Sequence, residues 1–359
     1  GRRFVDAINS ADGTALNAMI DIDALAARVL GRLDLNPVDR ARYRSGLRMQ
    51  NALLGHGVAS QMTVQQARAT LLRSTPFDPR GELLVRITTR DARGNEAHGY
   101  LQVELDPEGR IVDWYDHAVA LSMSGQLAFG AAGMLTTGDV ARLLFGDADE
   151  ALSRFGRMQE FAKLLSSGAL GPAHAVLMSM PESIRMRREF ATLRVTLARH
   201  VSIDAYREAM AEIALHHGDA DDLQLILIDH YLLGGEPARA LQAVDRAAAI
   251  LGNEEVMEAN RCHALGELDR MDEAVTACDR AIAMAPAFET PRWTRLRLAL
   301  KIENTALAIE SLDGIETAQG KKLDAAWMAT RPAYAWLMTQ PEFAAWAADR
   351  GWAPSSSAE

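Results

Sequence analysis

Four residues whose side chains can take part in acid–base chemistry lie close together in the chain: Asp113, Tyr115, Asp116 and His117. Side chains alternate between the two faces of a strand, so Asp113, Tyr115 and His117 are expected on one face, which could line a pocket. A buried aspartate with a raised pKa can act as a general base. The same pattern also fits a solvated strand face near the edge of a sheet. No GxSxG, HExxH, P-loop or GxGxxG motif occurs, and we therefore predict a protein that is not an enzyme and holds no cofactor.

Cys262 and Cys278 are the only cysteines of the chain. They are equidistant from the predicted turn of one helical hairpin, so their side chains can face each other within disulfide range. In an oxidising compartment the bond would stabilise the fold by about 3 kcal/mol, through the entropy of closing a loop of this length. The alternative is a pair of buried free thiols that act as small core residues. A metal site is not expected, because two sulfurs and His263 lack a fourth ligand.

The N-terminal part of the chain, residues 1–132, reads as helices followed by strands. Apolar spacing predicts helix from the N-terminus to about residue 30, and residues 40–70 are compatible with helix. Three strand-like segments follow at 83–89, 99–105 and 111–117, joined by turns at 91–95 and 106–109. Helices first and then an antiparallel meander is the pattern of an α+β domain.

This arrangement resembles the NTF2-like (cystatin-like) fold, in which a curved sheet wraps an N-terminal helix. The resemblance rests on the order of the elements and on the last strand, from Gly109 to His117. It implies a cone-shaped domain over residues 1–132. Some members of that family are enzymes whose pocket carries an Asp or a His, and many are only binding or dimerisation modules.

Small residues repeat at a fixed interval in the second half of the chain. Ala240, Ala274 and Ala308 are evenly spaced, and Ala247, Ala281 and Ile315 keep the same step. Small side chains are needed where two antiparallel helices cross closely. The step, about 34 residues, is the length of a tetratricopeptide helix–turn–helix unit.

Three units, 221–254, 255–288 and 289–322, resemble the tetratricopeptide repeat. Further positions of the pattern are occupied by Ile228, Tyr231, Gly235, Val244, Leu265, Pro286, Leu296 and Leu312. Upstream, four helices are expected at 151–165, 171–179, 184–200 and 203–217, and downstream Trp336, Trp346 and Trp352 suggest a cap on the last unit. The resemblance implies a superhelical solenoid that binds a protein or peptide.

The resemblance places the binding surface on the first helix of each unit. Its inward positions here are Asp222, Leu225, Asp229, Val256, Ala259, His263, Thr290, Trp293 and Arg297. No Lys and Asn clamp for a C-terminal carboxylate occurs among them, which disfavours an acidic tail as the ligand. Asp222, Asp229 and Trp293 instead suggest a peptide with basic and apolar side chains. The alternative is that these positions are merely solvated.

The negative charge is concentrated in the helical half. Residues 1–146 carry 16 Arg and 16 Asp+Glu, whereas residues 147–359 carry 22 Lys+Arg and 32 Asp+Glu and account for the net charge of −10. An acidic array is a poor nucleic-acid binder, because phosphate contacts dominate that affinity. No apolar run approaches the roughly 18–20 residues that span a bilayer. The chain begins at Gly1, which suggests that an upstream piece has been removed and, with the cysteine pair, favours an exported or periplasmic protein.

Together these observations predict a mainly helical protein in three parts. Residues 1–132 form an NTF2-like α+β domain, residues 133–352 form a tetratricopeptide-like solenoid with capping helices, and residues 353–359 form a disordered tail. The expected role is a non-enzymatic scaffold or adaptor for a protein partner. Two alternatives stay open: an enzyme or small-molecule sensor with its pocket in the N-terminal domain, and a structural homo-oligomer.

Overall fold

The computed structural model describes residues 1–33, 35–75, 80–90, 96–134, 156–161, 163–165, 167–320 and 322–352. The chain divides into two compact units, Gly1–Ile226 and Leu227–Glu359. The boundary between the units therefore lies beyond the predicted division at 132/133, because helices that follow the sheet in sequence belong to the first unit. The predicted tail at 353–359 lies outside the described residues.

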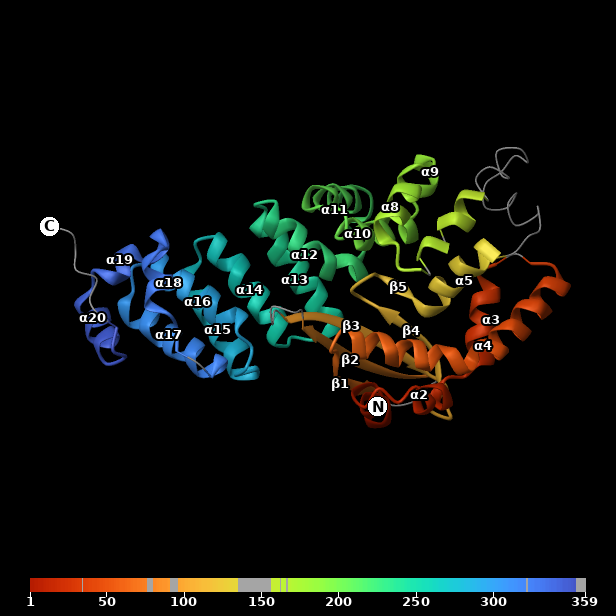
Figure 1. The fold of residues 1–359 in the computed structure, drawn as a ribbon, viewed down its shortest axis with the longest axis horizontal. Coiled ribbons are helices and arrows are strands. Elements are labelled where there is room, and N and C mark those ends of the chain that lie inside the picture. The colour runs from red at the N-terminus through yellow and green to blue at the C-terminus, as the bar shows by residue number, and fades with distance from the viewer. Residues whose placement is uncertain are drawn as a thin grey trace. The chain divides into compact units, whose positions relative to one another are not determined.

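Four helices precede the sheet (Figure 1): α1 (Arg2–Asn9), α2 (Gly13–Met19), α3 (Ile22–Gly31) and α4 (Pro37–Val64). The starts of α2, α3 and α4 follow from capping side chains. Asp12 accepts a hydrogen bond from the N–H of Ala15, and Asp21 and Asn36 cap α3 and α4 in the same way. Pro37 then occupies the first turn of α4, where its missing N–H leaves no donor unpaired.

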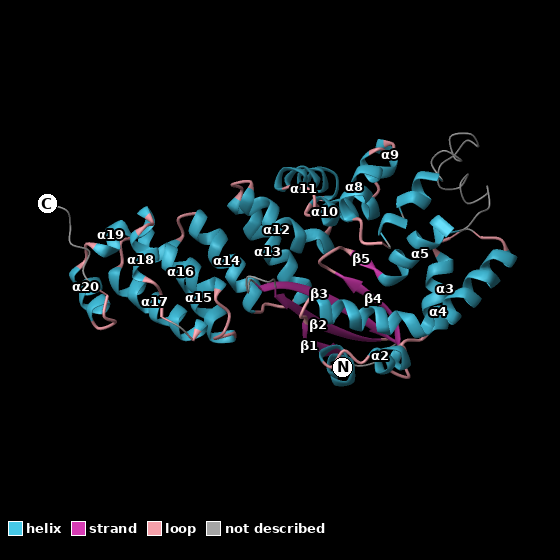
Figure 2. Cartoon of the chain, viewed as in Figure 1, coloured by secondary structure: helices cyan, strands magenta, loops and turns pink. Residues whose placement is uncertain are grey.

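The sheet has five antiparallel strands in the order β1-β2-β3-β4-β5 (Figure 2). They are β1 (Arg68–Thr75), β2 (Gly81–Arg90), β3 (Glu96–Leu105), β4 (Ile111–Asp116) and β5 (Leu121–Ser122). The meander predicted from the sequence is thus present, with an extra strand at each end. Residues 68–70, which were expected to be helical, begin β1, because Gln66 adopts a left-handed φ of 48° just after α4 ends.

One face of the sheet packs against α1, α2 and α4. The buried residues of this core include Phe4, Ile8, Leu16, Ala59, Leu83, Val85, Leu101 and Val103. Helices α2 and α4 cross so closely that a Cβ on Gly55 would lie 2.5 Å from the carbonyl oxygen of Gly13. The two glycines therefore set the distance between these helices.

The described residues that follow the sheet in the first unit are mainly helical. They form α5 (Met123–Met134), α8 (Leu170–Met178), α9 (Glu182–Arg185), α10 (Arg188–Ala198), α11 (Ile203–His217), the short 3-10 helix η1 (Asp221–Leu223) and the start of α12 (Gln224–Leu233). The predicted helices at 171–179 and 203–217 match α8 and α11. The segment 184–200 is split between α9 and α10. Of the helix expected at 151–165, residues 151–155 and 162 lie outside the described residues, and 156–161 and 163–165 are helical.

The second unit is a row of antiparallel helical hairpins. Its helices are the end of α12, α13 (Pro237–Leu251), α14 (Glu255–Glu267), α15 (Met271–Met284), α16 (Thr290–Lys301) and α17 (Thr305–Gln319). The second helices of successive hairpins start at equal intervals along the chain, at Pro237, Met271 and Thr305. Ala240, Ala274 and Ala308 are each fully buried, so the tetratricopeptide-like organisation of this part is confirmed.

The turn inside each hairpin repeats as well. Gly235, Asp269 and Glu303 all adopt a left-handed backbone, with φ between 53° and 70°. The N–H of the following residue bonds to a carbonyl five positions earlier in every case, from Glu236 to Tyr231 at 2.8 Å and correspondingly in the other two turns. This is the bond that closes a helix C-terminus, and it gives the three hairpins the same geometry.

Short helices close the end of the row: α18 (Ala325–Ala329), the 3-10 helix η2 (Pro332–Tyr334), α19 (Ala335–Met338) and α20 (Pro341–Ala348). Leu337, Phe343 and Trp346 are buried in one cluster with Leu312 and Ile315 of α17. The tryptophans of this region thus cover the apolar face of the last hairpin.

Candidate functional site

A cavity of about 440 Å³ lies within the first unit, on the face of the sheet that packs against α1, α2 and α4. Its walls are mostly apolar, and its described lining residues include Phe4, Val58, Met62, Leu101 and Trp114. The volume falls in the range of pockets that bind small organic molecules.

Asp116 is the only carboxyl group among the described residues that line this cavity. It lies at the end of β4, directly opposite Leu101 of β3, and its Oδ1 accepts a hydrogen bond of 2.8 Å from the N–H of Ala118. Burial raises the pKa of Asp116 to about 6, and the backbone N–H groups of Ala118 and Val119 oppose that rise. The cavity therefore contains a carboxyl group that no positive side chain neutralises in the described part of the chain.

The residues singled out from the sequence lie on the opposite face of the sheet. Asp113 pairs across the strands with Glu104, and Tyr115 pairs with Gln102. Neither they nor His117 line the cavity. Alternation correctly grouped the three side chains, but the cavity lies on the other side of the sheet. Of the four candidates, Asp116 is the one that lines it.

Asp113 is held by hydrogen bonds and an ion pair inside the first unit. The N–H and the hydroxyl of Ser124 donate to its two carboxylate oxygens at 3.0 and 2.5 Å, and Arg28 Nη1 lies 3.5 Å from Oδ2. Only 5% of the residue is exposed. These contacts give Asp113 a structural role in fastening α3 and α5 to β4.

Tyr115 joins the sheet to the helices that follow it. Its hydroxyl donates a 2.6 Å hydrogen bond to Asp222 at η1, and Arg188 of α10 contacts both Asp222 and Tyr115. Burial, together with the neighbouring Asp222, raises the pKa of Tyr115 well above its ordinary value. For Asp222, burial raises the pKa, but the bonds from Tyr115 and Arg188 outweigh it, so the pKa is lowered and the carboxylate stays charged.

His117 is buried beside this network. Its ring lies edge-on to Tyr115 with centroids 4.8 Å apart, and Nε2 lies 3.1 Å from the side-chain oxygen of Gln102. Burial lowers the pKa of His117 to about 4, so the imidazole is neutral at pH 7. The neutral ring and its contact with the Gln102 amide thus fasten the end of β4 to β3.

The residues predicted to bind a partner are divided between the two units. Asp222 and Leu225 belong to the first unit, and Asp222 is engaged by Tyr115 and Arg188. Asp229 is exposed, in the part of α12 that belongs to the second unit.

The other three predicted residues lie on α14 and α16. His263 Nε2 and Arg297 Nη2 approach the same carboxylate oxygen of Glu267, at 3.7 and 3.5 Å. Burial, with a smaller contribution from Arg297, lowers the pKa of His263. Trp293 packs edge-on against Trp327. The side chains of two successive first helices thus meet on one surface.

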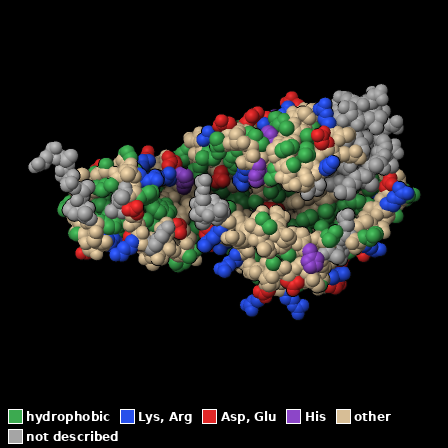
Figure 3. Space-filling model, in the orientation of Figure 1, with side chains coloured by type: hydrophobic (Ala, Val, Ile, Leu, Met, Phe, Trp, Pro, Cys, Tyr) green, Lys and Arg blue, Asp and Glu red, His purple; other side chains and the backbone are tan. Residues whose placement is uncertain are grey.

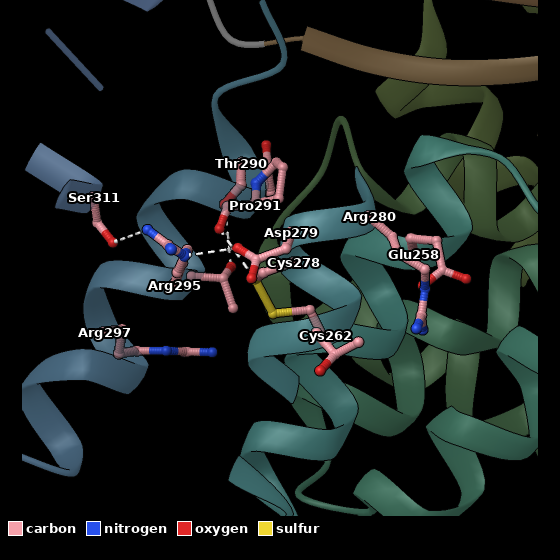
Figure 4. Close-up of a disulfide and its surroundings, with 12 residues drawn as sticks. Glu258, Cys262, Cys278, Asp279, Arg280, Thr290, Pro291, Arg295, Arg297 and Ser311 are labelled. Atoms are coloured by element: carbon pink, nitrogen blue, oxygen red, sulfur yellow. Dashed lines mark hydrogen bonds and ion pairs between the residues drawn. A yellow bond between two sulfur atoms is a disulfide. The ribbon is translucent and has the colours of Figure 1, made fainter. Parts of the chain in front are cut away.

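Cys262 of α14 and Cys278 of α15 are joined by a disulfide, with their Cα atoms 5.2 Å apart (Figure 4). Both residues are fully buried, at the crossing of the two helices of one hairpin. In the same hairpin the buried Glu258 accepts hydrogen bonds from Arg261 and from Arg280, the latter at 2.8 Å. The disulfide and the hydrogen bond from Arg280 to Glu258 both connect α14 to α15.

Within the described ranges, no group of three or more His, Cys, Asp or Glu side chains is arranged to hold a metal ion. Over the same residues, the structure contains no helix that is long and apolar enough to cross a membrane. Acidic and basic side chains are interspersed over the face seen in Figure 3.

No family model and no curated protein matches the chain. One solved structure, the "TPR2AB-domain:pHSP90-complex of yeast Sti1", is similar at 15% identity over 55% of this chain and 84% of that chain, with a TM-score of 0.26. A likeness at this level does not identify a partner or a function.

The sequence did contain a signal for the cavity residues. Leu101, Val103 and Leu105 alternate with polar residues and so mark the buried face of β3. Pairing β4 antiparallel to β3 places Trp114 opposite Val103 and Asp116 opposite Leu101, on that same face. Asp116 could thus have been assigned to the buried face from the apolar alternation of its neighbouring strand.

Proposed function

We propose that the chain is a scaffold that binds a segment of a partner protein along the first helices of its repeated hairpins. The observation that supports this is the surface shared by α14 and α16. Arg297 of one helix reaches Glu267 of the other at 3.5 Å, and His263 reaches the same oxygen. These side chains are between a third and a half exposed, so a ligand can contact them without unfolding the hairpins.

The charge of the second unit favours a partner segment with basic side chains. Residues 227–359 carry 20 Asp and Glu against 13 Lys and Arg. The excess of acidic groups attracts a basic segment and speeds its association. Trp293, half-buried beside Trp327, offers an apolar contact on the same helix as Arg297. We exclude Asp222 from the proposed surface, because its carboxylate already accepts a hydrogen bond from Tyr115 and forms an ion pair with Arg188.

The test is an in-cell cross-linking pull-down with the whole chain as bait. A variant with His263→Ala, Glu267→Ala and Arg297→Ala removes the shared surface. The matched control, Arg270→Ala with Glu273→Ala, removes an exposed 2.6 Å ion pair at the start of the second helix α15. We expect recovery of the partner to fall at least tenfold with the first variant and to be unchanged with the control.

Two outcomes would contradict the proposal. A partner recovered equally with both variants would show that the surface of α14 and α16 is not the binding surface. Recovery of the chain alone, cross-linked to itself, would favour a structural homo-oligomer.

A further inference from the structure

The cavity of the first unit is independent of the proposed scaffold surface, since every residue that lines it belongs to residues 1–226. One wall is the sheet, through Ile87, Leu101 and Trp114, and another is α4, through Val58 and Met62. Polar side chains line it as well, among them those of Gln61, Gln65, Gln126 and His98. An apolar chamber with a few polar groups is the usual form of a small-molecule site.

Gly99 lines this cavity and leaves space in it, because it has no side chain. It lies inside β3, opposite Ile87, where a glycine weakens a strand and often marks the close approach of a ligand. A Cβ at this position would meet only the Cβ of Ala118, at an ordinary contact distance of 3.5 Å. A side chain is therefore sterically allowed here, and its absence enlarges the cavity.

The charged groups of the lining indicate which charge a ligand of this cavity should carry. The carboxylate of Asp116 accepts backbone hydrogen bonds from Ala118 and Val119, and a carboxylate can accept about four. The one guanidinium among the described lining residues, that of Arg199, is already engaged by Tyr206, whose hydroxyl lies 3.1 Å from Nη2 and whose ring centre lies 5.0 Å from its carbon. No ion pair joins Arg199 to Asp116 in the described part of the chain, so the carboxylate of Asp116 keeps a negative charge that can pair with a cationic ligand.

We propose that this cavity binds a small apolar molecule with a protonated amine, and that the ammonium group pairs with Asp116. The apolar part would occupy the space between the sheet and α4, above Gly99. The ammonium group would supply the positive charge that the surrounding protein does not. Burying a carboxylate without a partner is unfavourable, and a charged hydrogen bond removes that cost.

The experiment uses the whole chain and two probes of nearly equal shape, 4-phenylbutylamine and 4-phenylbutan-1-ol. Affinities are measured by NMR titration at pH 7.5. We expect the amine to bind at least tenfold more tightly than the alcohol, which corresponds to a single charged hydrogen bond. Asp116→Asn should remove that difference, while the alcohol binds both proteins alike.

Two further variants separate binding in the cavity from other effects. Gly99→Val places a side chain in the cavity without touching Asp116 and should abolish binding of both probes. Glu108→Gln changes an exposed carboxyl group in the turn before β4 and should change neither affinity. Circular dichroism shows whether each variant is folded. If Gly99→Val does not fold, the comparison of wild type with Asp116→Asn still tests the preference for a charged ligand.

The proposal fails if the amine and the alcohol bind equally, if Asp116→Asn retains the preference, or if neither probe binds the wild-type chain. None of these outcomes bears on the scaffold proposal, because the cavity and the α14–α16 surface share no residue.

Discussion

Two aspartates of the same strand, β4, have opposite surroundings. Asp113 is held by Ser124 and lies 3.5 Å from the guanidinium of Arg28, whereas Asp116 is held by backbone N–H groups alone. The odd spacing between them places the two side chains on opposite faces of the sheet. One carboxyl group therefore has a structural role, and the other is left with acceptor capacity in a cavity.

The surroundings of Asp116 predict how stability depends on pH. Its pKa is raised from 3.8 to about 6 in the folded chain, so the folded state keeps a proton that the unfolded state loses between about pH 4 and pH 6. The wild-type chain therefore loses stability as the pH rises through that window. Asp116→Asn should remove this loss and be more stable than wild type by up to about 3 kcal/mol above pH 6, with no advantage below pH 4. Denaturant unfolding at a series of pH values measures the difference, and an advantage that does not change with pH would contradict the assignment.

The bond between Cys262 and Cys278 should protect both cysteines from alkylation. Alkylation of the unfolded, unreduced chain should label no cysteine, and prior reduction should expose two. Replacing both with alanine should lower the free energy of unfolding by about 3 kcal/mol, the value for a loop of this length. Two reactive thiols in protein purified without reductant would show that the bond is absent.

Helix packing in both units depends on small residues at close crossings. In the second unit Ala240, Ala274 and Ala308 serve this purpose, and each is fully buried. In the first unit Gly13 and Gly55 do so, since a Cβ on either would lie within 2.7 Å of backbone atoms of the other helix. Positions of this kind tolerate no added methyl group, because neither backbone can move aside cheaply.

Gly55→Ala should therefore lower the free energy of unfolding by about 1–3 kcal/mol, the usual cost of overpacking. The matched control is Gly57→Ala, slightly further along α4, where an added Cβ meets no atom within 4 Å. That substitution should raise stability by about 1 kcal/mol, through the better helix propensity of alanine. Thermal and denaturant unfolding of both variants measures the two effects, and equal changes would show that the crossing is not tight.

At the end of the row of hairpins, the apolar face of the last hairpin must be covered to keep it from water. Trp346 is 7% exposed, donates a 2.7 Å hydrogen bond to Asp313 of α17 and has the guanidinium of Arg350 over its ring. It packs in the same cluster as Leu312 and Ile315. A repeat array requires such a cover, because each hairpin is stabilised by its neighbours alone.

Trp346→Ala should lower the free energy of unfolding of the second unit by about 3–5 kcal/mol, since it removes a buried aromatic ring. The newly exposed face of α17 should also bind a hydrophobic dye such as ANS. Met284→Ala, at a side chain in the same unit that is 48% exposed, is the control and should change stability by less than about 0.5 kcal/mol. A Trp346→Ala chain as stable as wild type would mean that the cap is dispensable.

The repeated hairpins could be predicted from the sequence because their determinants are local. A fixed period, small residues at helix crossings and turns that end each first helix all recur within one unit, and each unit contacts only its neighbours. The strands 83–89, 99–105 and 111–117 were also predictable, from alternation and short turns. The NTF2-like resemblance of the first part remains a prediction, since no comparison bears on it.

Contacts between residues far apart in the sequence decided which candidate residues lie on the binding surface and which line the cavity. Asp222 occupies a groove position by its place in the repeat, but Tyr115, far earlier in the chain, holds its carboxylate. The cavity depends on which face of the sheet α4 covers, and that choice assigns Asp116 to the cavity and Asp113 to the opposite face. Alternation along a strand gives two sets of side chains but does not say which set is buried. The pairing of β4 with the alternating strand β3 indicates the face on which Asp116 lies, but only the packing of the helices leaves a cavity at that face.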